Sequence, residues 1–84
     1  MLTVSVISAE ATLFEGQATS VVAPAFDGEV GILTNHAPMI TALGKGLLRV
    51  EQSGATQRFS VSGGFLQVVD NQVRVVTEQA SISR

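Results

Sequence analysis

The sequence has no cysteine, tryptophan or tyrosine, and only 14% of its 84 residues are charged. Without cysteine there is no disulfide framework, no thiolate nucleophile and no cysteine-based metal site. A small domain without disulfides fits a reducing compartment. The five basic residues are scattered without an aromatic platform and the net charge is -2, so the composition argues against nucleic acid as a partner.

Long apolar segments are missing as well. The longest uncharged stretch, residues 30–44, contains Asn35, His36 and Pro38, and it falls short of the ~20 apolar residues that a membrane helix needs. The N-terminus shows no basic region followed by an apolar run and a small-residue cleavage site. We therefore expect the chain to be soluble when isolated.

The composition that is present is typical of a small folded domain. We expect one domain over residues 1–84, because so short a chain cannot build a second core. The hydrophobic fraction of 45% is ordinary for a folded protein. The low charged fraction indicates that a partner covers part of the surface.

Apolar residues alternate with a period of two. Leu2, Val4 and Val6 are interleaved with Thr3 and Ser5, which is typical of a half-buried strand. Nowhere do apolar residues repeat at helical spacing over three turns, and eight glycines together with many valines and threonines also disfavour helix. The sequence predicts an all-β fold, a two-layer antiparallel β-sandwich of about ten short strands.

Turn signals recur at the short spacing that is typical of a sandwich or barrel. Residues 26–29, 53–54 and 70–71 are predicted turns between strands. Residues 44–46 are expected to interrupt the chain before a strand over 47–52. Residues 63–64, both glycine, are expected to form a bulge or a close backbone approach between strands over 56–61 and 65–69.

His36, the only histidine, is the first candidate for catalysis. As a base it would need a nucleophile or an orienting carboxylate, and as a metal ligand it would need companions. Asp27 and Glu29 lie upstream, but at no recognised metal-ligand spacing. A loop histidine that hydrogen-bonds the backbone or contacts a partner is the favoured interpretation. We predict no catalytic residue, no metal and no cofactor.

Asp27 and Glu29 also flank Gly28 at a predicted hairpin tip. Two carboxylates at this spacing could act as a general acid and base. More often such residues form a solvated turn, where Asp and Gly are favoured for backbone reasons. A third interpretation is an exposed acidic tip that docks on a basic loop.

Lys45 stands between two glycines, a position that resembles the modified lysine of biotin and lipoyl carrier domains. Those domains are β-sandwiches of about this length with the lysine at a hairpin tip. An acidic residue or a methionine normally precedes that lysine, whereas Gly44 precedes it here. A solvated turn lysine is favoured, and a carrier domain modified at Lys45 is the alternative function.

Residues 28–41, GEVGILTNHAPMIT, resemble the signature of the F-type ATP synthase epsilon family. Upstream segments SAE (8–10) and LFEG (13–16), and downstream segments VSGGFLQV (61–68) and NQVRV (71–75), match in the expected order over essentially the whole chain. Thr34 stands where the family commonly has proline. The family usually continues into a C-terminal helical hairpin, which these residues do not contain, so its inhibitory and ATP-sensing roles are not carried over.

The resemblance implies a mechanical function. In the family the sandwich binds the foot of the γ subunit and rests on the polar loops of the membrane c-ring, which couples ring rotation to γ during proton-driven ATP synthesis. Such a subunit is not an enzyme by itself. It would be a peripheral membrane protein at the cytoplasmic face of a bacterial plasma membrane, or at the stromal side of a plastid thylakoid.

The resemblance also implies two sets of partner-binding residues. Those that correspond to the acidic turn facing the c-ring are Asp27, Gly28 and Glu29. Those that correspond to positions near the γ subunit are Ser8 and His36, with Ala37, Pro38 and Met39 as apolar neighbours.

Overall fold

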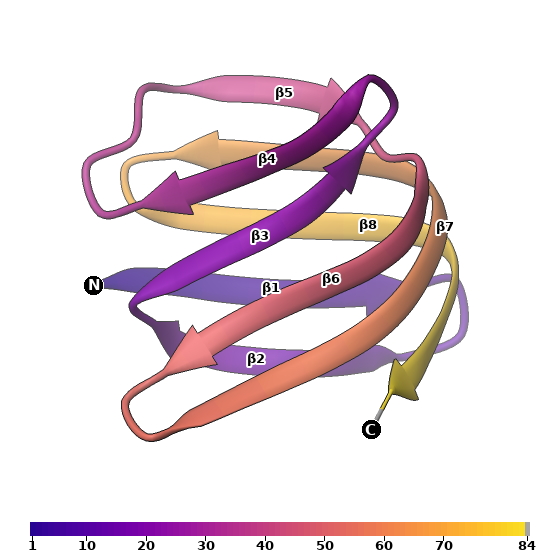
Figure 1. Ribbon diagram of the computed structural model, residues 1–84, viewed down its shortest axis with the longest axis horizontal. Helices are drawn as coiled ribbons and strands as arrows, with labels where there is room; N and C mark the ends of the chain where they lie inside the picture. The colour runs from indigo at the N-terminus through magenta and orange to yellow at the C-terminus, as the bar shows by residue number, and fades with distance from the viewer. Residues whose placement is uncertain (84) are drawn as a thin grey trace.

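Strands make up most of the computed structural model, which describes residues 1–83 (Figure 1). Within these residues there is no helix and there are eight strands: β1 Leu2–Ser8, β2 Thr12–Ala18, β3 Ser20–Ala25, β4 Gly28–Leu33, β5 Met39–Ala42, β6 Lys45–Gln52, β7 Ala55–Val69 and β8 Gln72–Ser83. The all-β sandwich is confirmed, with eight strands rather than about ten.

One continuous sheet forms both layers, because its two longest strands belong to both. β7 pairs with β6 through residues 55–62 and with β5 through residues 65–68. β8 follows β7 along its length, and its first half also pairs with β1. One layer therefore has the order β2-β1-β8-β7-β5, and the other has the order β8-β7-β6-β3-β4 (Figure 1).

The strands pass from one layer to the other at Gly63 and Gly64. The predicted close backbone approach is found here, but there is no bulge, because the β7–β8 register runs through both glycines without a shift. Both glycines have positive φ, 73° and 101°. A Cβ on Gly64 would collide with the carbonyl oxygen of Val76, and a Cβ on Gly63 would collide with the Glu78 carboxylate. The backbone bends here without leaving the sheet, so the two strands predicted on either side of the glycines form one strand of 15 residues.

The core lies between the layers and follows the predicted alternation. β1 buries Leu2, Val4 and Val6 completely, as the sequence pattern predicts. β6 and β7 contribute further side chains with the same period, among them Leu48 and Leu66. Each layer therefore has one inner face that packs on the core and one outer face that is free for other contacts.

β1 and β8 run parallel, whereas every other pair is antiparallel as predicted. Their register runs from Thr3 opposite Gln72 to Ser8 opposite Thr77. The antiparallel prediction assumed that all neighbouring strands in the sheet are joined by short hairpin turns. It fails for this pair because no hairpin connects strands that lie at opposite ends of the sequence.

Local turn chemistry accounts for most of the hairpins. Asp70 and Asn71 have φ of 49° and 62°, the left-handed pair that a two-residue hairpin requires, and Gly54 has φ of 80°. The expected break at residues 44–46 is misplaced by one residue, since Lys45 is already the first residue of β6.

Gly64→Ala should lower the free energy of unfolding by about 3 kcal/mol or more, because φ is unfavourable and the methyl group meets backbone. Urea denaturation followed by circular dichroism measures the loss. Gly31→Ala is the control, since a Cβ there meets no atom within 4 Å. An equal midpoint for Gly64→Ala and the unmodified chain would show that the bend does not require glycine.

Candidate functional site

The predicted acidic turn forms the tip of the β3–β4 hairpin. Phe26 and Asp27 are the turn residues, and Gly28, with φ of 130°, is the first residue of β4. Two backbone hydrogen bonds hold this tip to the end of β5. The Phe26 N–H donates to the Ala42 carbonyl at 3.1 Å, and the Gly44 N–H donates to the Pro24 carbonyl at 2.7 Å.

The tip presents one aromatic ring and two carboxylates to solvent. Phe26 is 71% exposed, and a two-residue turn does not itself require an aromatic residue at this position. The Glu29 carboxylate lies 3.8 Å from the guanidinium of Arg49, the single ion pair within residues 1–83. Both side chains are more than a third exposed, so the pair adds little stability. Asp27 has no such partner in the described chain, which leaves its charge available to a cation outside it.

His36 lies in the loop between β4 and β5, residues 34–38. Its backbone N–H donates to the Leu33 carbonyl at 3.1 Å, and its ring Nδ1 lies 2.7 Å from the Ala37 carbonyl oxygen. Since a carbonyl only accepts, Nδ1 carries the proton of this hydrogen bond. The favoured interpretation, a loop histidine bonded to backbone, agrees with this geometry. Across residues 1–83, no three His, Cys, Asp or Glu side chains gather as a metal site would require.

Ser8 ends β1 and closes the turn that leads to β2. Its Oγ lies 3.3 Å from both the carbonyl oxygen and the amide nitrogen of Ala11. Thr3, at the start of the same strand, is bonded to Asn71, which in turn contacts Asn35 beside His36. Ser8 is about 17 Å farther along the strand. The structure therefore places the two predicted γ-facing positions at opposite ends of one layer.

An apolar row crosses the outer face of the layer between these two ends. Ala42 pairs with Phe65, Phe65 with Val76, and Val76 with Ile7, so one residue comes from each of β5, β7, β8 and β1. Ile40, two residues before Ala42 on the same side of β5, is 68% exposed. We call these five residues the outer apolar face.

The outer apolar face connects the sequence-predicted residues. A hollow of about 370 Å³ beside Phe65 and Val76 has Ser8 in its lining. At the opposite end Met39 leads into Ile40, but the Met39 side chain packs against the core. Sequence reasoning thus named Met39 and missed Ile40 and Phe65. The signal for Phe65 was its alternation with buried Leu66 and Val68, whereas Ile40 joins this face only through the pairing of β5 with β7.

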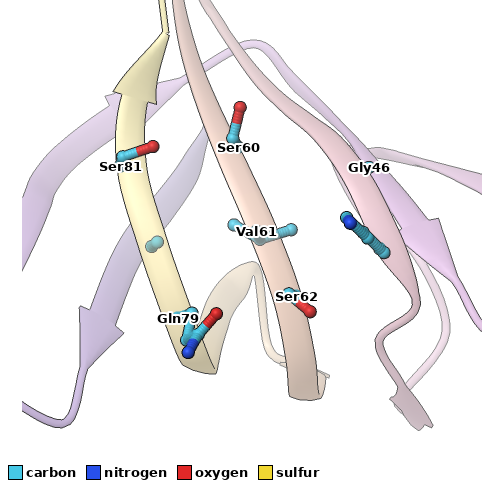
Figure 2. A pocket seen from close by; sticks show the side chains of 8 residues that line it. Gly46, Ser60, Val61, Ser62, Gln79 and Ser81 are labelled. Atoms are coloured by element: carbon cyan, nitrogen blue, oxygen red, sulfur yellow. The ribbon is translucent and has the colours of Figure 1, made fainter.

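Lys45 does not have the geometry of a carrier lysine. It is the first residue of β6 and pairs with Ser62, so its side chain is exposed as predicted, but it lies in a paired strand rather than in a turn or at a hairpin tip. The residue borders a shallow groove of about 450 Å³ across β6, β7 and β8. Figure 2 shows that small or polar side chains line this groove: Gly46, Ser60, Val61, Ser62, Gln79 and Ser81.

In the portion of the chain that the structure describes, no helix combines the length and the apolar character needed to cross a membrane.

Comparison with known proteins settles the family. The family model described as ATP synthase, Delta/Epsilon chain, beta-sandwich domain, matches residues 1–83. The chain belongs to this family. The resemblance of residues 28–41 to the epsilon signature is thereby confirmed, and the biotin or lipoyl carrier alternative has no support.

Similar curated proteins carry the name ATP synthase epsilon chain. The one from Leptospira borgpetersenii serovar Hardjo-bovis (strain JB197) is 42% identical over 81 residues, 96% of this chain and 64% of that protein. The one from Syntrophomonas wolfei subsp. wolfei is 43% identical over 76 residues, 89% of this chain and 56% of that protein. The chain therefore spans less than two thirds of the length of these relatives.

Two solved structures share the fold. A chain in the Euglena gracilis mitochondrial ATP synthase structure (OSCP/F1/c-ring, rotational state 1) superposes with a TM-score of 0.89 and 24% identity, over 96% of this chain and 52% of that one. A chain of the Tetrahymena thermophila mitochondrial ATP synthase central stalk and c-ring gives 0.79 and 16%, over 95% and 65%. At these identities the likeness establishes the β-sandwich fold of the family.

The intact mass of the native chain should show no biotinyl or lipoyl addition, because Lys45 lies in a paired strand rather than at an exposed tip. Mass spectrometry after expression with biotin and lipoate ligases tests this. A known carrier domain expressed in the same cells serves as the positive control. A modified Lys45 would contradict the structural assignment.

Proposed function

We propose that the chain is the β-sandwich part of an epsilon-type subunit in the central stalk of a rotary F-type ATP synthase. It couples rotation of the c-ring to the γ subunit during proton-driven ATP synthesis, and it catalyses no reaction itself. Family membership and the epsilon chains that are about two fifths identical to it support this assignment.

The observation that carries the proposal is the outer apolar face. Its members are solvent-exposed or half-buried in the isolated chain, with Ile40 at 68% and Phe65 at 39% exposure. A contiguous apolar patch on a small domain favours a site that a protein partner covers. We assign the γ subunit to this face, with Ser8 at one end and the loop of His36, Ala37 and Pro38 at the other.

The acidic tip suits a second partner with basic polar loops, the c-ring. Asp27 and Glu29 supply negative charge, and the exposed Phe26 ring supplies an apolar contact beside them. Charge complementarity at such a contact mainly sets register and docking rate. Glu29 forms an ion pair with Arg49 in the free chain, so a basic loop of the partner has to compete with Arg49 for the Glu29 carboxylate.

One backbone hydrogen bond joins the two surfaces directly. The Phe26 N–H at the acidic tip donates to the carbonyl of Ala42, and Ala42 belongs to the outer apolar face. A load on the tip therefore reaches the γ-facing strand through backbone and a packed core, which deform little. Such stiffness is what a coupling element between two rotor parts needs.

The proposed location follows from the partners. The chain is held at the membrane through the c-ring and γ, as a peripheral protein on the cytoplasmic side of a bacterial plasma membrane or the stromal side of a thylakoid.

Purified chain mixed with the γ subunit of the same source tests the proposal. Co-elution as a complex is expected, with no ATP hydrolysis by the chain alone. Failure to bind γ would overturn the assignment. Hydrolysis of ATP that His36→Ala abolishes would overturn the non-catalytic role.

Ile40→Lys should weaken binding to γ by about tenfold or more, since it places a charge in an apolar contact without touching the core. Isothermal titration calorimetry measures the affinity. Ile82→Lys is the matched control, because Ile82 is equally exposed, at 68%, but lies on β8 outside the outer apolar face. Equal affinities of the two variants would contradict the assignment of this face to γ.

Glu29→Lys should leave the fold intact and lower proton-driven ATP synthesis by about half or more, because like charges would then meet at the c-ring. Synthesis is measured in inverted membrane vesicles that carry the variant. Glu15→Lys makes the same charge change at an exposed position of β2 and should retain activity. Unchanged synthesis with Glu29→Lys would remove the acidic tip from the docking model.

A further inference from the structure

Three separate segments meet at Asn71 in the β7–β8 turn. The N–H of Thr3 in β1 donates to the Asn71 backbone carbonyl at 2.8 Å. The backbone N–H of Asn35, in the loop between β4 and β5, donates to Asn71 Oδ1 at 2.6 Å. The Asn71 Nδ2 in turn donates to Asn35 Oδ1 at 3.2 Å. We call this reciprocal pair of side-chain hydrogen bonds the Asn35–Asn71 clasp.

The clasp joins residues that are 36 positions apart in the sequence, and it crosses from one layer to the other. β4 is the last strand of its layer, β5 is the last strand of the other, and the loop spans the end between them, beside the β7–β8 turn (Figure 1). Because this loop is not itself paired in a sheet, the clasp is its tie to the body of the domain.

The clasp holds Asn35 in an uncommon backbone conformation. Its φ is 67°, in the left-handed region that non-glycine residues seldom adopt. The next residue is His36, whose N–H and ring bond to Leu33 and Ala37 within the loop. The clasp therefore fixes the direction in which His36, Ala37 and Pro38 leave the end of β4.

We propose that Asn71 is a positioning residue for the γ-binding loop. It does not contact γ; it holds residues 34–38 in one conformation before γ arrives, so that the complex forms without the entropic cost of ordering a free loop. This inference rests on the proposed function, and it adds to the γ-binding surface a determinant that lies on a different hairpin.

The variant Asn71→Gly removes the clasp but keeps the β7–β8 turn. Glycine accepts the φ of 62° at this position, and Asp-Gly is a favoured sequence for a two-residue hairpin, so the β7–β8 turn is kept while both side-chain bonds are lost. Asp70→Gly is the matched control, with the same substitution at the neighbouring turn position, whose φ is 49°. Asn71→Asp keeps an acceptor for the Asn35 N–H and is the rescue variant.

Two measurements read the outcome. In proton–nitrogen correlation spectra, Asn71→Gly should shift the Asn35 amide resonance upfield and speed its hydrogen exchange, with Asp70→Gly close to the unmodified chain. In titration calorimetry with γ, Asn71→Gly should bind about fivefold to tenfold more weakly, while Asp70→Gly and Asn71→Asp should stay within about twofold.

Each alternative result has its own meaning. Equal γ affinity of Asn71→Gly and the unmodified chain, with the Asn35 exchange accelerated, would overturn the positioning role and leave the proposed function intact. If Asp70→Gly weakened γ binding as much as Asn71→Gly, the loss would come from the altered turn, and the positioning role of Asn71 would be overturned. No binding of γ by the unmodified chain would overturn the proposed function and this inference together.

Discussion

The close approach of two backbones at Gly64 is the constraint on which this fold depends. A β-carbon there would occupy the space of the Val76 carbonyl oxygen. Because glycine leaves that space empty, β7 and β8 bend together and remain hydrogen-bonded from one layer into the other. The layers are consequently parts of one sheet. The core is enclosed because this sheet bends over it, rather than by the packing of two separate sheets.

This arrangement decides where the two candidate surfaces lie. The second half of β7 turns Phe65 to the outside of one layer, where Ala42, Val76 and Ile7 complete an apolar row. The β3–β4 hairpin of the other layer reaches the end of β5 and places Phe26 beside Ala42. An apolar side and an acidic tip on one stiff body suit the proposed role of a connector between two partners.

Local chemistry was readable from the sequence, and long-range pairing was not. The alternation in β1 and the turns at residues 53–54 and 70–71 depend on neighbouring residues, and they were predicted correctly. The glycines at 63–64 were expected to separate two strands, because a bend within a strand and a strand end have the same local signal. The parallel pairing of β1 with β8 has no local signal at all.

The candidate site shows the same division. The family motif suggested Asp27, Glu29 and the loop of His36 as candidates, since these residues lie close together in the sequence. Ile40 and Phe65 become neighbours of one face only when β5 pairs with β7, and Asn71 meets Asn35 only across the end of the sandwich. Lys45 was expected in a turn because glycines flank it, yet it pairs with Ser62 of the neighbouring strand β7.

The central place of β8 has a consequence for biosynthesis. β8 lies between β1 and β7, so the layer that contains β1 cannot close until residues 72–77 are available to pair. During translation the β1–β2 hairpin would keep an open edge until residues 72–77 have left the ribosome. Folding of this chain is therefore a late event, completed after synthesis of the last strand rather than built up strand by strand.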